Sequence, residues 1–162
     1  MVNEMKIKTA ILFYIILSAL GVLFHYCYGW LNMDILKIVF PKNESVFEHL
    51  KLLLFPTIIM ALIDMIFYRT EGMEGYILGL LIAMVFMVAS HYTVVGITGK
   101  ELMPFDIGIY FISTFIIMYY RFKKITLGNM TMSVITLILI IVFIEYFTFY
   151  PLEIPFFLSP QL

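Results

Sequence analysis

Five long apolar runs constrain this chain more than any other feature of its sequence. They cover about residues 9–30, 46–68, 76–97, 105–120 and 130–150. A helix needs roughly 20 mainly apolar residues to cross a bilayer, and most of these runs approach or exceed that length. In lipid a spanning segment must satisfy its backbone hydrogen bonds internally, so each run is expected to be a helix. The sequence therefore predicts an all-α, polytopic transmembrane helix bundle with about five spans.

Composition supports the same class of protein and excludes others. Hydrophobic residues make up 63% of the chain, whereas a soluble domain is about half apolar. The net charge of −1 provides no basic surface, so no nucleic-acid partner is expected. The single cysteine, Cys27, excludes an intrachain disulfide and a multi-cysteine metal cage. We expect one transmembrane domain over residues 1–162, surrounded by membrane lipid.

The connections carry helix signals of their own. Residues 35–40 form an apolar stretch that is too short to span, with Lys37 among apolar neighbours. We expect this stretch to lie in the membrane interface or to fold back over the bundle. Ser45 and Glu48 make an S-x-x-E capping box at the start of the second run. Pro56 lies inside that run and predicts a kink.

Two glycines and the basic residues predict helix contacts and orientation. Gly75 and Gly79 form a G-x-x-x-G pair at the start of the third run, which favours close approach of another helix. The N-terminus and the loops at 69–75 and 121–129 carry six Lys or Arg residues, and the opposite side carries four. Because Lys and Arg concentrate on the cytoplasmic side, the N-terminus is expected in the cytoplasm and the C-terminus outside the cell.

Ionisable residues within the runs gather at one end of the predicted bundle. In a serial bundle the ends of odd runs and the starts of even runs share a side. At about 1.5 Å per residue, the three histidines, Asp106 and Glu145 fall within roughly two helical turns of that side. Such groups usually face the bundle interior or a wet cavity. We therefore expect a polar layer formed by His25, Glu48, His49, His91 and Glu145, with Tyr26, Tyr92 and Thr93 nearby.

This combination of side chains suggests a metal site. Imidazole and carboxylate groups are the ligands that zinc and other transition metals prefer. His25, His49 and His91 with a carboxylate would complete a tetrahedral site. The same three histidines with a water would leave a catalytic site, with Glu48 or Glu145 as the general base. The sequence has no H-E-x-x-H pattern, and a b-type haem between two imidazoles is a further interpretation.

Each of these residues also has a purely structural interpretation. Glu48 can serve only the capping box, and Lys51 can pair with it one turn later. His25 lies in an aromatic belt and can bond a carbonyl or a tyrosine, His49 can be an interfacial residue on the first helical turn, and His91 can join two helices. Glu145 lies among apolar neighbours, so it needs a partner, which could be His91, His25 or Lys51, or must be neutral.

The start of the second run also resembles a known family. The pattern N-E-S-x-x-E-H-x-K, followed by an apolar run, is similar to small uncharacterised multi-pass membrane proteins of Firmicutes, especially clostridia. The resemblance covers roughly the first two runs and implies no activity. Its matching positions make further candidates for ligand binding, beside Tyr92 of the polar layer: Asn43, Glu44, Ser45 and Lys51.

A more distant likeness is to membrane hydrolases of the alkaline ceramidase and adiponectin-receptor group, which hold zinc with three histidines on transmembrane helices. That group has seven spans and Ser and Asp signatures that have no place here, so only the three-histidine idea carries over. The leading hypothesis is a metal-dependent membrane enzyme, such as a lipid or amide hydrolase. The alternatives are a transporter component that binds a ligand, or an accessory subunit that works in a homo-oligomer or with a partner subunit.

Overall fold

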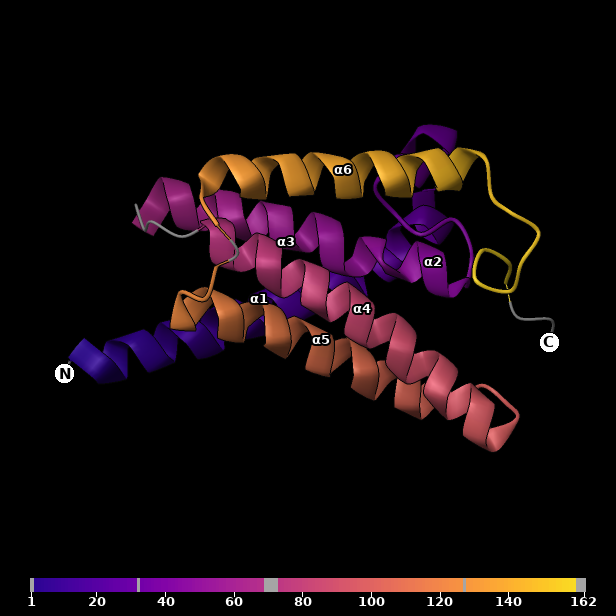
Figure 1. Cartoon of the computed structure of the whole chain (residues 1–162), viewed down its shortest axis with the longest axis horizontal. Helices are drawn as coiled ribbons and strands as arrows, with labels where there is room; N and C mark the ends of the chain where they lie inside the picture. The colour runs from indigo at the N-terminus through magenta and orange to yellow at the C-terminus, as the bar shows by residue number, and fades with distance from the viewer. Residues whose placement is uncertain (1, 32, 69–72, 127, 160–162) are drawn as a thin grey trace.

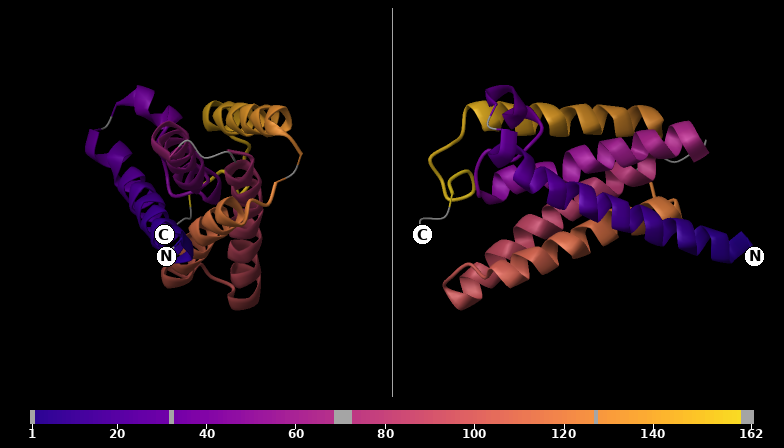
Figure 2. Two further views of the ribbon diagram at one scale, coloured as in Figure 1. Left: turned by 90° about the vertical axis from the view of Figure 1, so that its left-hand side faces the viewer. Right: turned by 180° about the vertical axis from the view of Figure 1, so that it is seen from behind.

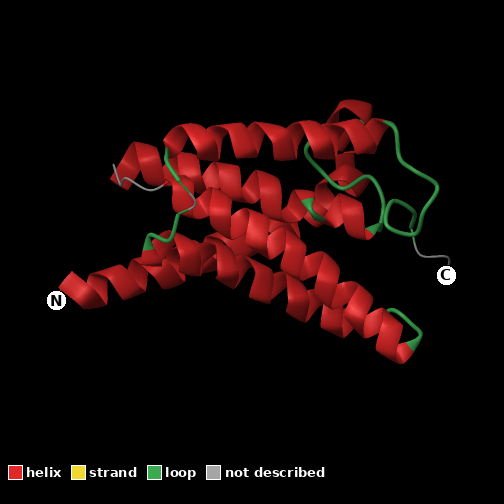
Figure 3. Cartoon of the chain, in the orientation of Figure 1, coloured by secondary structure: helices red, strands yellow, loops and turns green. Residues whose placement is uncertain are grey.

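The computed structural model describes the chain except for residues 1, 32, 69–72, 127 and 160–162, and its regular structure within the described residues is helical throughout (Figure 3). Figure 1 labels the main helices. The elements are α1 (Val2–Leu31), η1 (Asp34–Ile38), α2 (Val46–His49), α3 (Lys51–Ile63), η2 (Asp64–Tyr68), α4 (Met73–Thr98), α5 (Met103–Lys123) and α6 (Met130–Phe149).

Five helical stretches of the described chain are long and apolar enough to cross a membrane. They are Ile7–Leu31, Val46–Phe67, Glu74–Thr98, Met103–Lys123 and Met130–Phe149. The second of these combines α2, α3 and η2. The prediction of an all-α, multi-pass membrane protein is therefore confirmed. The two ends of the chain lie at opposite ends of the bundle (Figure 1), as an odd number of spans requires.

The second span is the central one. Figure 2, seen from one end of the bundle, shows α3 between α1 and α6. Within the most apolar window of each span, 56% of the residues of the second span are buried but only 17% of those of α6. The second span is thus the most buried one and packs against α1 and α4, whereas α5 packs mainly against α4, and α6 contacts α4 and leaves most of its surface to lipid.

The predicted glycine pair allows α4 and α5 to approach closely. A Cβ atom on Gly79 would lie 2.9 Å from the Cα of Ile117, and one on Gly75 would lie 3.0 Å from the Cα of Arg121. Both distances are to backbone atoms of α5, which cannot move aside as a flexible side chain would. Glycine at these two positions therefore sets the separation of the α4–α5 hairpin.

A third glycine allows α1 to contact both α3 and α5. A Cβ atom on Gly21 would lie 2.0 Å from the hydroxyl oxygen of Tyr110 and 2.7 Å from the carbonyl oxygen of Leu52. The Tyr110 hydroxyl donates to the Ser18 carbonyl at 2.8 Å. The Leu52 carbonyl receives no backbone hydrogen bond from residue 56, because Pro56 has no N–H.

The sequence predicted a kink at Pro56. In the structure Pro56 lies inside the continuous helix α3, and the break in the second span lies at Leu50, between α2 and α3.

One end of the bundle, called the histidine end below, is where α1, α4 and α6 finish and α2 and α5 begin. Two segments fold over it. The predicted interfacial stretch forms η1, and its Lys37 ammonium lies 5.1 Å from the ring centroid of Phe149. The C-terminal tail docks beside α2, because Phe47 donates its N–H to the Phe156 carbonyl at 3.1 Å. The buried ring of Phe157 packs 4.6 Å from the ring of Phe47.

A buried ion pair joins three helices at the opposite end. The Nε of Arg121 lies 2.7 Å from Oδ2 of Asp64. The Tyr76 hydroxyl donates to the same oxygen at 3.2 Å, and the Arg121 guanidinium lies over the Tyr76 ring. Asp64 is the first residue of η2, a π-helical turn that continues α3. This arrangement connects α4 and α5 to the second span.

Candidate metal centre

A tight turn precedes α2 and presents Glu44 at the histidine end. Ser45 is the N-cap of α2, and its Oγ accepts a hydrogen bond from the Glu48 N–H at 3.2 Å. The Oδ1 of Asn43 accepts from the Ser45 N–H at 3.0 Å. Asn and Ser are favoured at such positions because their short polar side chains replace backbone partners. The 42–45 turn is therefore held by local hydrogen bonds, with Glu44 exposed between them.

Three side chains from separate segments converge beside this turn. His25 comes from the last part of α1, Glu44 from the 42–45 turn and His49 from the end of α2. One possible ligand atom from each lies within 4.8 Å of the others. The Nε2 of His49 lies 3.5 Å from Oε2 of Glu44, and the Nε2 of His25 lies 3.9 Å from the same oxygen. These three residues are the candidate metal centre.

The hydrogen bond of His49 prepares its Nε2 for a cation. Its Nδ1 lies 2.8 Å from the Ser45 carbonyl oxygen, which can only accept, so Nδ1 carries the proton. In the neutral ring, Nε2 then presents a lone pair toward the carboxylate. The Nε2 of His25 lies near the same carboxylate, and the Nδ1 of His25 is buried without a hydrogen-bond partner among the described residues. Either a proton or a metal ion can join two imidazoles to a carboxylate in this way, and imidazole and carboxylate are ligands that transition metals prefer.

The spacing of the three groups is close to that of a zinc site. Zinc bonds to His nitrogen and carboxylate oxygen are about 2.0–2.2 Å long, so ligand atoms of a tetrahedral site lie roughly 3.3–3.5 Å apart. The distances from Glu44 to the two histidines, 3.5 and 3.9 Å, are near that value. A small rotation of the exposed Glu44 side chain would shorten both distances. Three protein ligands also leave a fourth position open for water or a substrate.

The candidate metal centre is partly exposed at the histidine end of the bundle. The Glu44 side chain is 66% exposed, whereas the side chains of His25 and His49 are each 27% exposed. The ring of Tyr26 contacts His25 and stacks on Trp30 with the ring centroids 5.8 Å apart, and both aromatic residues are exposed. Tyr and Trp prefer the interface between lipid headgroups and water. The exposed Tyr26 and Trp30 therefore favour a position of the candidate centre near the lipid headgroups.

Glu48 points away from the metal centre into a buried network. Its Oε2 accepts from the Lys51 ammonium at 2.9 Å and from the Lys42 N–H at 3.1 Å. Its Oε1 accepts from the Thr148 hydroxyl at 3.1 Å. Glu48 is 1% exposed and Lys51 is fully buried. The predicted capping box is thus half formed: Ser45 caps the Glu48 N–H, but the carboxylate bonds the N–H of Lys42 instead of that of Ser45.

Further contacts extend this network to η1 and α6. The Lys51 ammonium also donates to the Lys37 carbonyl, and the Lys42 ammonium donates to the Thr148 carbonyl. Glu145 interacts electrostatically with Lys51 and with Glu48. Both carboxylate oxygens of Glu145 are buried and have no hydrogen-bond partner among the described residues. Of the partners that the sequence suggested for Glu145, the structure brings Lys51 into electrostatic range.

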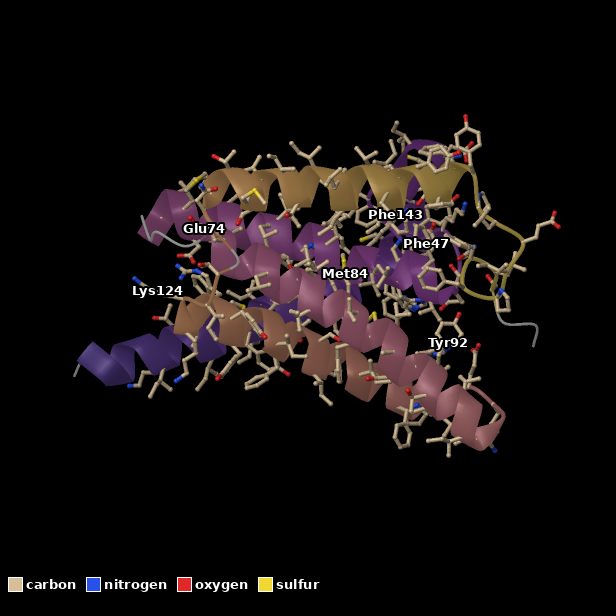
Figure 4. The ribbon with its side chains drawn as sticks, in the orientation of Figure 1. Phe47, Glu74, Met84, Tyr92, Lys124 and Phe143 are labelled. Carbon is tan, nitrogen blue, oxygen red and sulfur yellow. The ribbon has the colours of Figure 1, made fainter. Side chains whose placement is uncertain are left out.

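His91 lies on the α4–α5 hairpin and does not belong to the group of three. Its Nδ1 lies 2.7 Å from Oδ1 of Asp106, and its Nε2 lies 3.9 Å from Oε1 of Glu101. Tyr92 follows it on α4, and its ring lies 6.4 Å from the ring of Phe156 in the tail. Figure 4 labels Tyr92 on α4 at the same end of the bundle as Phe47.

The structure brings together two of the three predicted histidines, His25 and His49, and places Glu44 beside them, whereas His91 lies beside Asp106 and Glu101. Glu44 was expected only as a ligand-binding position. The sequence does hold one signal for Glu44 as a ligand. Glu44 lies five residues before His49 and directly before Ser45, the N-cap of α2. Sequence spacing alone does not show that this turn faces the end of α1.

Comparison with known proteins places the chain in a family without supplying an activity. A protein-family profile described as "Family of unknown function (DUF6512)" matches residues 2–160. The match covers nearly the whole chain, whereas the resemblance seen in the sequence covered roughly the first two runs. Comparison with curated proteins and with solved structures gave no match. A function for this chain must therefore come from its own residues.

Proposed function

The chain belongs to the DUF6512 family, whose function is unknown, and we propose that it is a metal-dependent membrane hydrolase. In this proposal His25, Glu44 and His49 bind a transition-metal ion, with zinc the best fit. The observation that carries the proposal is the convergence of their ligand atoms within 4.8 Å from three separate segments. Two His and one Glu form a donor set that catalytic zinc sites use, whereas structural zinc sites are closed by four protein ligands.

Hydrolysis is the chemistry that an open zinc position at this place supports. Bound zinc lowers the pKa of its water toward neutrality and polarises a carbonyl oxygen. Held by His25, Glu44 and His49, such an ion would supply an activated water for attack on the carbonyl carbon of an ester or amide, and the proton of that water would go to the leaving oxygen or nitrogen. Glu48 is buried and its carboxylate accepts hydrogen bonds from Lys42, Lys51 and Thr148, so this proposal assigns it no role as a general base.

Membrane lipids are the substrate class that fits the position of the centre. The exposed Tyr26 and Trp30 beside His25 belong at the headgroup region. Ester and amide bonds of lipids lie at that depth, so such a bond can reach the open metal position without leaving the bilayer. The excess of Lys and Arg on the opposite side of the bundle supports a centre that faces the cell exterior, with the N-terminus in the cytoplasm.

Metal binding is tested first, on the full chain purified in detergent and stripped with a chelator. Zinc binding is titrated by calorimetry, and bound metal is measured by mass spectrometry. We expect one zinc ion per chain. His25→Ala, His49→Ala and Glu44→Gln should each weaken zinc binding by at least tenfold. His91→Ala is the matched control, because it removes an imidazole at the same end of the bundle but outside the group, and it should bind zinc like the wild type.

Turnover is tested separately with a p-nitrophenyl ester of a medium-chain fatty acid in mixed micelles. Zinc-loaded wild type should hydrolyse the ester faster than the chelator-treated protein, and His49→Ala should lose that increase. Zinc binding without metal-dependent hydrolysis of any ester or amide lipid would refute the hydrolase and favour a metal-binding transporter component. Absence of zinc binding in the wild type would refute the metal centre itself.

A further inference from the structure

We propose that Glu48 is a positioning residue for the metal centre, which holds the 42–45 turn so that Glu44 faces the two histidines. This inference rests on the proposed function, because it concerns the same ligands. The sequence suggested Glu48 as a general base or as a helix cap. Its contacts support a third role, in which the Glu48 carboxylate does not touch the metal but holds the backbone of the 42–45 turn that carries Glu44.

Glu48 holds the turn at both of its ends. Its carboxylate accepts the N–H of Lys42 at 3.1 Å, and its own N–H donates to Oγ of Ser45 at 3.2 Å. Glu44 lies between these two anchored residues. The Glu44 side chain is 66% exposed, so side-chain packing does little to place it. The direction in which Glu44 points is therefore determined mainly by the backbone that Glu48 holds.

The same carboxylate connects the turn to two membrane spans. Lys51 of α3 donates to Oε2 of Glu48, and Thr148 of α6 donates to Oε1. All three side chains are buried: their residues are 0–1% exposed. The turn is thus positioned relative to the bundle and not only relative to its own hydrogen bonds. Because ligand geometry affects metal affinity strongly, changes behind the ligands typically weaken metal binding by about 10–100-fold.

The contacts of Glu48 also argue against a direct part in the reaction. A general base needs an oxygen within hydrogen-bond reach of the metal-bound water. One oxygen of Glu48 already accepts from Lys51 and from Lys42, and the other accepts from Thr148. With 1% of the residue exposed, the carboxylate has no open path to water at the metal. Its influence must pass through the turn.

The test measures the zinc dissociation constant of the full chain in detergent, by competition with a fluorescent chelator. Glu48→Gln keeps an oxygen acceptor but loses the charge, and it should weaken zinc binding by at least tenfold. Thr148→Val removes one hydrogen bond to Glu48 without leaving a charge unpaired, and it should weaken zinc binding roughly three- to tenfold. Thr57→Val is the matched control. It makes the same change at a fully buried threonine whose hydroxyl has no partner among the described residues, and zinc affinity should stay within twofold of the wild type.

Two further measurements separate positioning from a general loss of structure. The absorption spectrum of the cobalt-substituted protein reports ligand geometry, and it should change in Thr148→Val but not in Thr57→Val. Thermal unfolding of the metal-free proteins should show that both variants are folded, with Thr148→Val less stable than Thr57→Val because only Thr148→Val loses a hydrogen bond. If Glu48→Gln does not fold, Thr148→Val decides the question.

The possible outcomes distinguish this inference from the proposed function. If the wild type binds zinc and both Thr148→Val and Glu48→Gln bind it with unchanged affinity, the positioning role is refuted and the metal centre stands. If Glu48→Gln keeps the zinc affinity but loses the rate of hydrolysis, Glu48 acts in the reaction and the positioning role is again refuted. If the wild type binds no zinc, both proposals fail together.

Discussion

Replacing Lys51 with methionine tests the buried ion pair at the histidine end, because the two side chains are similar in length and differ in charge. Lys51 is fully buried, and its ammonium donates to Oε2 of Glu48 at 2.9 Å and to the Lys37 carbonyl at 2.5 Å. Lys51→Met removes both hydrogen bonds and the positive charge. It leaves the Glu48 carboxylate at 1% exposure, with Glu145 in electrostatic range and without the ion pair that Glu48 forms with Lys51.

The expected loss of stability in Lys51→Met comes from the Glu48 carboxylate, which stays buried without its partner. Removing one partner of a buried ion pair costs about 3–5 kcal/mol, because the remaining charge stays out of water without compensation. The hydrogen bonds from Thr148 and from the Lys42 N–H reduce that cost, and the nearby Glu145 increases it. We therefore expect Lys51→Met to lower the free energy of unfolding by about 4 kcal/mol. The double variant Glu48→Gln/Lys51→Met should be more stable than Lys51→Met, since no unpaired charge is then buried.

The free energy of unfolding is measured in detergent micelles by titration with a denaturing detergent, followed by circular dichroism. Lys100→Met is the matched control, because Lys100 is exposed in the turn between α4 and α5, and its effect should stay within about 0.5 kcal/mol. If Lys51→Met costs no more than Lys100→Met, the reasoning is wrong. A double variant less stable than Lys51→Met by itself would also contradict it.

Three other predictions concern the helix contacts and the metal. Gly79→Ala should destabilise the protein by about 1–3 kcal/mol, because the new methyl group would meet backbone atoms of α5. Gly96→Ala on the same helix, where a Cβ meets nothing within 4 Å, should be neutral or stabilising by up to about 1 kcal/mol in the same unfolding assay. Tyr76→Phe should cost about 1 kcal/mol by removing the hydrogen bond to the buried carboxylate at the other end. Zinc at roughly 100 times its dissociation constant should stabilise the protein by about 2.7 kcal/mol in thermal unfolding. This gain should disappear in His49→Ala and persist in His91→Ala.

Much of the fold could be predicted from local sequence because lipid leaves few choices. A run of apolar residues in a bilayer must bond its own backbone, so run length alone indicates a spanning helix. The Ser45 cap and the close approach at Gly79 followed in the same way from short-range rules. The grouping of polar residues at one end also followed, because the order of the spans decides which ends share a side.

The sequence could not show which polar residues of that end meet. That choice depends on the rotation of each helix about its axis, and spans that are apolar on nearly every side carry little rotational information. His91 turns toward Asp106 of the neighbouring helix, whereas His25 and His49 turn toward each other. Glu145 was identified as unusual from its apolar neighbours, but its proximity to Lys51 depends on how α6 lies against the second span.

The sequence by itself determined the class of the protein, its helical spans and the end at which its ionisable residues gather. The tertiary structure decided that Glu44 joins His25 and His49 while Glu48, one turn later, is buried away from them. The physical reason is the 42–45 turn. Its direction is determined by hydrogen bonds to Glu48, whose own position depends on Lys51 and Thr148 of two different spans, and contacts between distant spans form only when the bundle is assembled.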